Sequence, residues 1–217
     1  MKKAVIFDFN GTLLWDTQLH NRAWDIFLKE HKIDLSDEEK NYVIHGKTNN
    51  DIFRSLFRKE FDTQRMNKLS EEKESIYRNL CIETNIQLAE GAIELFNYCK
   101  HNRIPFVIAT SAYKQNIDFY INRFNLLKWF DINSIIYNDG TIRSKPDPDI
   151  FNIAIQKLNR NPEDVIVFED SVAGINAAIA AKVGKIVIVN SNNDNYSRYN
   201  YEVINNLSQF EYYKLQT

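Results

Sequence analysis

Residues 4–12 read AVIFDFNGT, an unbroken apolar run that ends in a carboxylate, an amide and a glycine turn. A short run of this kind with β-branched residues is typical of a strand buried on both faces of a parallel sheet. Ligands of such sheets bind outside the carboxyl ends of the strands. Asp8 and the residues that follow it are therefore the first candidates for a functional site.

Three later segments have the same apolar character as residues 4–7, and helical patterns lie between them. Strand and helix therefore alternate from about residue 90 onward. This alternation predicts an α/β fold with a Rossmann-like parallel sheet core and helices on both faces. The predicted strands are residues 106–109, 165–168 and 186–189, and the predicted helices are residues 93–101, 115–124, 150–158 and 172–181.

The stretch 16–88 breaks the alternation, because its apolar residues recur at helical spacing and it contains no convincing strand. We predict an inserted all-helical cap domain at residues 16–88, with the core formed by residues 1–15 and 89–217. The alternative is a helical hairpin of the core itself. Roughly seventy residues is much longer than a usual connection after a strand, which favours the cap.

Composition excludes several classes of protein. With 217 residues, 44% hydrophobic and 26% charged, the chain has ordinary globular values. A net charge of -2 provides no global basic field for nucleic acid or an anionic membrane, and no apolar run approaches the ~20 residues that span a bilayer. The cysteines Cys81 and Cys99 are far apart, and no signal peptide is recognisable. We expect a cytoplasmic monomer, without nucleic-acid or membrane partners.

The first three predicted strands deliver polar residues at their carboxyl ends. Asp8 follows the first strand, Thr110 and Ser111 follow the second, and Glu169 and Asp170 follow the third. Each alone is equally explained as an N-cap of the next helix. Together these carboxylates would repel each other unless a cation compensates them, and Mg²⁺ prefers such oxygen ligands. The sequence therefore predicts a Mg²⁺ cofactor, with Lys145 as a further cation.

The motifs resemble those of the haloacid dehalogenase (HAD) superfamily. Residues 8–13 (DFNGTL) resemble its DxDGT signature, Thr110 its second motif, residues 145–148 (KPDP) its lysine motif and residues 169–175 (EDSVAGI) its fourth. They occur in the family's order, and the resemblance covers nearly the whole chain. Residues 20–24 (HNRAW) and the Glu-Asp form of the last motif are most similar to the β-phosphoglucomutase-like branch.

The resemblance implies a role for each matching residue. Asp8 would attack phosphorus and form an aspartyl-phosphate. Mg²⁺ would bind the Asp8 carboxylate, the backbone carbonyl of Asn10 and Asp170, with Glu169 nearby or linked through water. Thr110 and Lys145 would hold the phosphoryl oxygens of a small phosphorylated substrate. The resemblance also makes Gly11, Thr12, His20, Lys47 and Ser111 candidates for substrate binding.

Asn10 departs from the family, which usually has a proton-transferring Asp there. An amide can neither protonate a leaving group nor activate water, so turnover should fall by ~10²–10⁴ while the backbone metal contact survives. Three explanations remain open: an engineered Asp→Asn change, another acid such as His20, or a protein that binds phospho-ligands without turnover.

The cap also departs from the mutase pattern. Where a mutase-like cap has an Arg for a distal phosphate, residues 46–51 (GKTNND) place Asn49, and Lys47 is the only candidate replacement within the segment. The sequence thus favours a Mg²⁺-dependent phosphohydrolase of a small metabolite, a sugar phosphate, over a β-phosphoglucomutase-like mutase. A phospho-ligand-binding protein with impaired turnover is a further alternative. The residues 169–170 and 11–12 argue against C–halogen hydrolysis. Residues 191–200, rich in Asn, Ser and Tyr, are interpreted as a solvated loop without a role.

Overall fold

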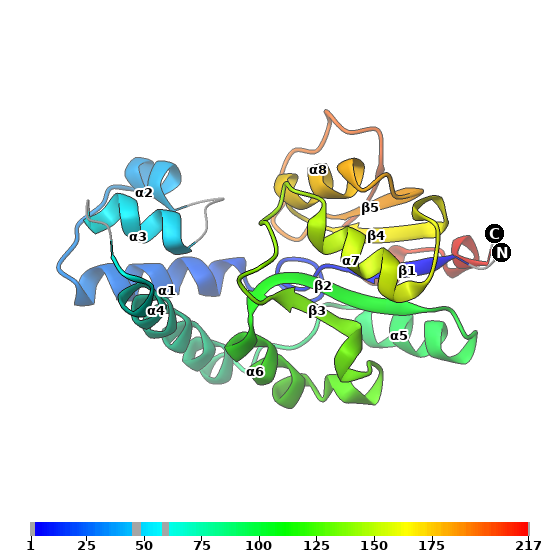
Figure 1. Ribbon diagram of the computed structural model, residues 1–217, viewed down its shortest axis with the longest axis horizontal. Coiled ribbons are helices and arrows are strands. Elements are labelled where there is room, and N and C mark those ends of the chain that lie inside the picture. Colours follow the sequence, from blue (N-terminus) through cyan, green and yellow to red (C-terminus); the bar gives the residue numbers. More distant parts are fainter. Residues whose placement is uncertain (1–2, 45–48, 58–60, 217) are drawn as a thin grey trace. The chain divides into compact units, whose positions relative to one another are not determined.

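A computed structural model describes residues 3–44, 49–57 and 61–216 (Figure 1). They form two compact units, which are described in turn. Unit 1 comprises Met1–Trp15 and Gln87–Thr217, and unit 2 comprises Asp16–Ile86. None of the described helices is both long enough and apolar enough to cross a membrane.

Unit 1 contains a six-stranded sheet in the order β3-β2-β1-β4-β5-β6, and its paired neighbours are parallel. The predicted α/β fold is confirmed, because the four predicted strands are present. Two short edge strands, β3 and β6, were missed. The strands are β1 (Ala4–Phe7), β2 (Phe106–Tyr113), β3 (Ile135–Asn138), β4 (Val165–Glu169), β5 (Lys185–Val189) and β6 (Glu202–Ile204).

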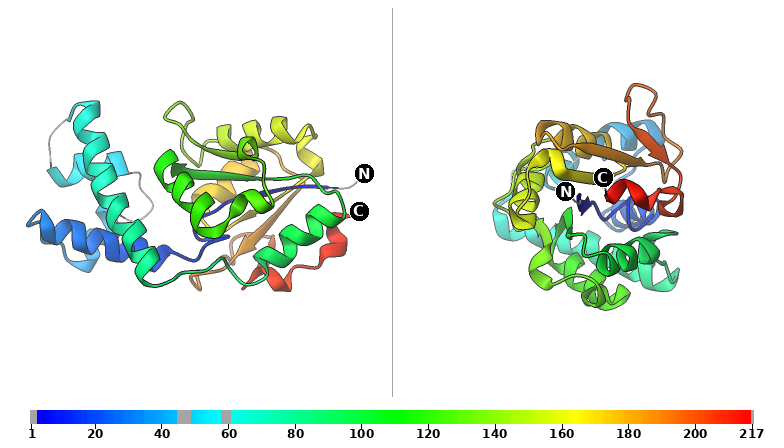
Figure 2. Two further views of the ribbon diagram at one scale, coloured as in Figure 1. Left: turned by 90° about the horizontal axis from the view of Figure 1, so that it is seen from below. Right: turned by 90° about the vertical axis from the view of Figure 1, so that its right-hand side faces the viewer.

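Helices cover both faces of this sheet, as predicted (Figures 1 and 2). α7 (Asp149–Leu158) and α8 (Val172–Ala180) lie on one face. α5 (Ala92–His101) and α6 (Lys114–Phe124) lie on the other. The chain order reverses between β1 and β4. Such a switch point opens a crevice at the carboxyl ends of the strands, where ligands of α/β sheets bind.

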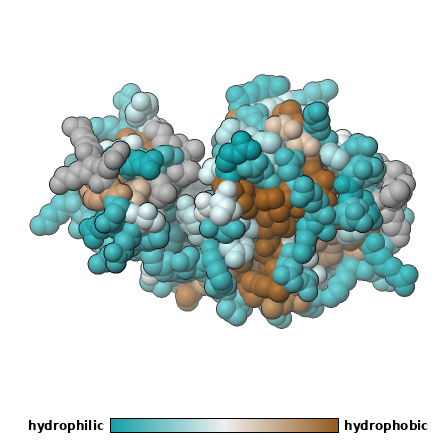
Figure 3. Space-filling model, viewed as in Figure 1, coloured by the Kyte–Doolittle hydropathy of each residue, from teal (hydrophilic) through white to brown (hydrophobic). Residues whose placement is uncertain are grey.

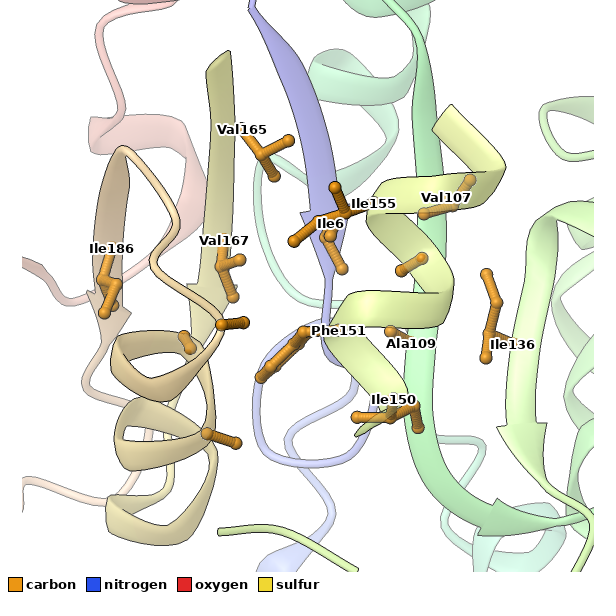
Figure 4. Packing of buried hydrophobic residues seen from close by; sticks show 14 of the residues in the cluster. Ile6, Val107, Ala109, Ile136, Ile150, Phe151, Ile155, Val165, Val167 and Ile186 are labelled. Carbon is orange, nitrogen blue, oxygen red and sulfur yellow. The ribbon is translucent and has the colours of Figure 1, made fainter. Parts of the chain in front are cut away.

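The core under α7 and α8 fixes the central strands. Ile6 of β1, Val167 of β4, and Phe151 and Ile155 of α7 are buried together (Figure 4). On the other face, the Phe7 ring contacts those of Phe96, Phe106 and Phe168 at centroid distances of 5.4, 6.4 and 5.1 Å. β1 is thus packed on both faces, so the residue that follows it has little freedom to move.

The two ends of unit 1 lie side by side at the amino-terminal edge of the sheet (Figures 1 and 2). The Lys3 N–H donates to the Leu215 carbonyl at 3.1 Å. Apolar side chains reach the surface elsewhere on this unit, as the space-filling view shows (Figure 3). They include Leu127, Ile132 and Ile153. Exposed apolar side chains are common on folded proteins and imply no function by themselves.

Unit 2 is helical in its described part. Its helices are α1 (Thr17–Glu30), α2 (Asp37–Val43), α3 (Asn49–Phe57) and α4 (Thr63–Glu83). Its apolar core joins Trp24 and Phe27 of α1 to Phe53 of α3 and Leu69 of α4. Ser36 and Glu39 form a reciprocal capping box at the start of α2. That unit 2 acts as a cap stays a prediction.

Candidate active site

Asp8, Lys145 and Glu169 form a buried charged group at the carboxyl edge of the sheet. The Lys145 Nζ lies 2.5 Å from Asp8 Oδ1 and 2.7 Å from Glu169 Oε2. Only 7% of the Lys145 side chain is exposed. Burial by itself would lower the Lys145 pKa, but the two carboxylates raise it above its ordinary value. Lys145 therefore stays a cation in contact with the carboxylate that ends the first strand.

The residues after β4 hold Glu169 in place. Its Oε1 accepts hydrogen bonds from the Ser171 backbone N–H at 3.0 Å and from the Ser171 hydroxyl at 2.7 Å. The same hydroxyl accepts from the Gly174 N–H and caps α8. A Cβ on Gly174 would lie 2.0 Å from the Glu169 carboxyl carbon, so only glycine leaves room for this side chain. Ser171 therefore positions the acid as well as starting the helix.

Asp170 lies against the turn that follows Asp8. Its Oδ1 accepts a hydrogen bond from the Thr12 hydroxyl at 3.0 Å. Gly11 has φ +82°, and a Cβ there would approach Asp170 Oδ2 to 2.0 Å. Burial raises the Asp170 pKa well above its ordinary value, and the charges of Glu169 and Asp8 raise it further. The acidic group is thus electrostatically short of positive charge even with Lys145 present.

The oxygen atoms of Asp8, Glu169 and Asp170 fit a divalent cation. One carboxylate oxygen from each lies within 4.8 Å of the others. Three carboxylates and one lysine leave the group with excess negative charge, and oxygen donors are those that Mg²⁺ prefers. Asp8 and Asp170 would hold the ion. Glu169 is already bonded to Lys145 and Ser171, which suits a supporting role.

Asn10 is linked to two buried residues of unit 1. Its Nδ2 donates to the Tyr120 hydroxyl at 2.7 Å, and the Thr110 hydroxyl lies 3.5 Å from its Oδ1. The Tyr120 ring stacks on that of Phe9 at 4.4 Å. The amide at position 10 is therefore held by its neighbours. Sequence patterns missed Tyr120, because an aromatic residue on α6 has the spacing of an ordinary core residue.

Comparison with known proteins explains this constellation. A model of haloacid dehalogenase-like hydrolases matches residues 2–182, which is most of the chain. The chain belongs to this family. The phosphorylated carbohydrates phosphatase of Thermotoga maritima is 29% identical over 197 residues, covering 88% of each chain. The predicted family assignment is confirmed.

Solved structures of HAD hydrolases have the same fold. One from Entamoeba histolytica is 34% identical, with a TM-score of 0.89, and the match covers 98% of this chain and 97% of that one. The β-phosphoglucomutase of Clostridium difficile is 26% identical, with a TM-score of 0.78, over 100% and 96%. Together with the named phosphatase, these relatives support a HAD-type phosphatase related to the β-phosphoglucomutase-like branch.

In this HAD hydrolase, the other residues that were predicted to bind the substrate lie in different environments. The Gly11 N–H donates to the Leu14 carbonyl at 2.7 Å and the Thr12 N–H to the Phe9 carbonyl at 3.3 Å, so both stabilise the turn. Ser111 is exposed. Lys47 lies outside the described residues. Substrate contacts of all four stay predictions.

His20 belongs to a polar cluster inside unit 2. Its ring stacks on Tyr77 at 3.8 Å, its Nδ1 lies 2.8 Å from Lys73 Nζ, and its Nε2 lies 3.5 Å from Asp16 Oδ2. Lys73 also contacts Glu74 Oε1 at 2.9 Å. His20 is therefore packed among charged partners, and its suggested catalytic role stays a prediction.

Glu74 should make stability sensitive to acid. Burial by itself raises its pKa, but Lys73, His20 and the Asn49 amide lower it from 4.5 to about 2. A lowered folded-state pKa contributes stability above the ordinary value of 4.5, which is lost as pH falls toward 2. Glu74→Gln should therefore lose less unfolding free energy between pH 6 and pH 3 than the parent, as measured by urea denaturation.

Glu83→Gln provides the matched control, because Glu83 is an exposed residue of the same helix. It should keep the acid sensitivity of the parent. Equal acid sensitivity in the Glu74 variant and the parent would contradict a stabilising role for this carboxylate.

Proposed function

We propose that this HAD hydrolase is a Mg²⁺-dependent phosphohydrolase of a small phosphorylated metabolite, a sugar phosphate, acting through an aspartyl-phosphate on Asp8. The observation that best supports this proposal is the contact of Lys145 with both Asp8 and Glu169, beside the Asp170 carboxylate. The proposed nucleophile, a buried cation and an acidic group with the oxygen donors for a metal thus lie at one edge of the sheet. The name of the Thermotoga relative, a phosphorylated carbohydrates phosphatase, suggests that the substrate is a sugar phosphate.

The residues divide the chemistry between them. An Asp8 carboxylate oxygen attacks phosphorus, and the bond from phosphorus to the substrate oxygen breaks. Water then attacks the phosphoryl group on Asp8, which releases inorganic phosphate and restores the carboxylate. Lys145 and the Thr110 hydroxyl offset the negative charge of the transferring group. When bound, Mg²⁺ neutralises phosphoryl charge and orients the group toward Asp8.

The residue at position 10 does not provide proton transfer in this site. The leaving oxygen needs a proton and the attacking water must lose one, but the Asn10 amide can do neither. In the proposed reaction, solvent water supplies and removes these protons. We therefore expect slow turnover.

Asn49 supports a phosphatase over a mutase. Its Nδ2 donates to Glu74 Oε1 at 2.9 Å inside unit 2. The side chain is neutral and is held beside a carboxylate, so it does not supply the positive charge that a second phosphate would require.

A second candidate is a phospho-ligand-binding protein with impaired turnover. The amide of Asn10 favours it, because that amide is held by Tyr120 and lacks a transferable proton. This candidate predicts Mg²⁺-dependent binding of sugar phosphates without phosphate release.

Phosphate release from a panel of sugar monophosphates tests the proposal, with and without Mg²⁺. The parent should release phosphate only with Mg²⁺, and Asp8→Asn should reduce release to background because the nucleophile is gone. Mass spectrometry of the acid-quenched parent should detect one added phosphoryl group, absent from the Asp8 variant. Release that persists in Asp8→Asn or without metal would reject the mechanism, and binding without release or phosphorylation would favour the second candidate.

A further inference from the structure

The segment that follows β5 is tied to the proposed metal site through Tyr196. Sequence patterns indicated a solvated loop at residues 191–200, and this interpretation is wrong for Tyr196, which is 6% exposed. Its ring belongs to the apolar core shared with α7 and α8. The Tyr196 hydroxyl donates to the backbone carbonyl of Asp170.

Hydrogen bonds within the segment stabilise the loop that carries Tyr196. The Asn190 Nδ2 donates to the Asp194 carbonyl at 3.1 Å, and the Asp194 N–H donates to Asn190 Oδ1 at 2.8 Å. The Tyr199 N–H donates to the Tyr196 carbonyl at 2.9 Å, which closes a turn that begins at Tyr196. The phenol therefore approaches Asp170 from an ordered loop.

The Asp170 carbonyl receives no hydrogen bond from within α8, so a donor from another segment can satisfy it. Asp170 precedes Ser171, the N-cap of α8, so its carbonyl lies outside the hydrogen bonds of that helix. The hydroxyl thus fixes the peptide group between Asp170 and Ser171.

Fixing this peptide opposes a specific force. One oxygen of each carboxylate of Asp8, Glu169 and Asp170 lies within 4.8 Å of the others, and Lys145 contacts only Asp8 and Glu169 among them. Without a further cation, their remaining repulsion drives the carboxylates apart. Thr12 restrains the Asp170 side chain, and Tyr196 restrains its backbone. A site held in its binding geometry binds a metal more tightly than one that must be reassembled.

We propose that Tyr196 is a positioning residue that holds Asp170 for divalent-cation binding, an inference that rests on the proposed metal site. Loss of an outer partner of a metal ligand typically weakens metal affinity by ~10- to 100-fold. Tyr196→Phe removes the hydroxyl and keeps the buried ring. Mg²⁺ affinity of the variant, measured by calorimetry without substrate, should fall by about that factor.

Tyr199→Phe is the matched control, because it makes the same chemical change in the same segment, and the Tyr199 hydroxyl lies 3.4 Å from Asn176 Oδ1. It should keep the parent's Mg²⁺ affinity. Thermal unfolding of the metal-free proteins separates the roles, since a merely structural tyrosine would lower the melting temperature and leave Mg²⁺ affinity unchanged. That result would overturn the inference.

Asp170→Asn distinguishes this inference from the proposed function. If the parent binds Mg²⁺ more tightly than Asp170→Asn, and Tyr196→Phe binds as tightly as the parent, only the role of Tyr196 is wrong. If the parent itself shows no binding that depends on Asp170, the proposed function fails and the inference fails with it.

Discussion

Asn10→Asp should raise Mg²⁺-dependent phosphate release by ~10²–10⁴, the usual contribution of general acid–base catalysis. The two side chains have nearly the same shape, and Tyr120 lies 2.7 Å from the Asn10 Nδ2, where its hydroxyl can donate to a carboxylate instead. The new acid therefore has a partner in the existing fold. Steady-state kcat on the best sugar phosphate, measured for parent and variant, gives the size of the gain.

The gain must depend on the nucleophile. Asp8→Asn in the Asn10→Asp background should return release to background, which excludes a new reaction at residue 10. Hydrolysis of the phosphorylated enzyme should also be faster in Asn10→Asp, because the new carboxylate can activate the attacking water. An unchanged kcat would assign proton transfer to another group and remove Asn10 as the cause of slow turnover.

Lys145→Met should destabilise the protein by ~3–5 kcal/mol in the absence of metal, because removal of one partner leaves buried charges uncompensated. The ammonium contacts both Asp8 and Glu169, and all three side chains are buried. Methionine keeps much of the volume but none of the charge. The unfolding free energy from urea denaturation of metal-free protein measures the loss.

Mg²⁺ should restore part of the stability lost in Lys145→Met, since a cation among the three carboxylates replaces some of the missing positive charge. Phosphate release should still be lost, because the variant lacks the cation beside the nucleophile. Lys157→Met is the matched control on the exposed side of α7, and such surface changes usually shift stability within about 0.5 kcal/mol. Equal stability of the two variants would show that Lys145 does not compensate this site.

The sequence by itself determined the central strands and the acidic edge. Apolar runs such as residues 4–7 and 165–168 are long and pure enough to predict strands buried on both faces. Because carboxyl ends of parallel strands share one edge, Asp8 and Asp170 could be predicted to lie close together. The edge strands β3 and β6 were not predicted. They have only four and three residues, which are too few to show a clear apolar pattern.

Only the tertiary structure decided which side chains support this edge. Tyr120 and Tyr196 lie 110 and 26 residues from their hydrogen-bond partners Asn10 and Asp170, and nothing local in the sequence marks a contact over such separations. Tyr196 even lies in a segment with the composition of a loop. Local composition and periodicity report burial and secondary structure, whereas a hydrogen bond between distant segments depends on how the whole sheet is packed.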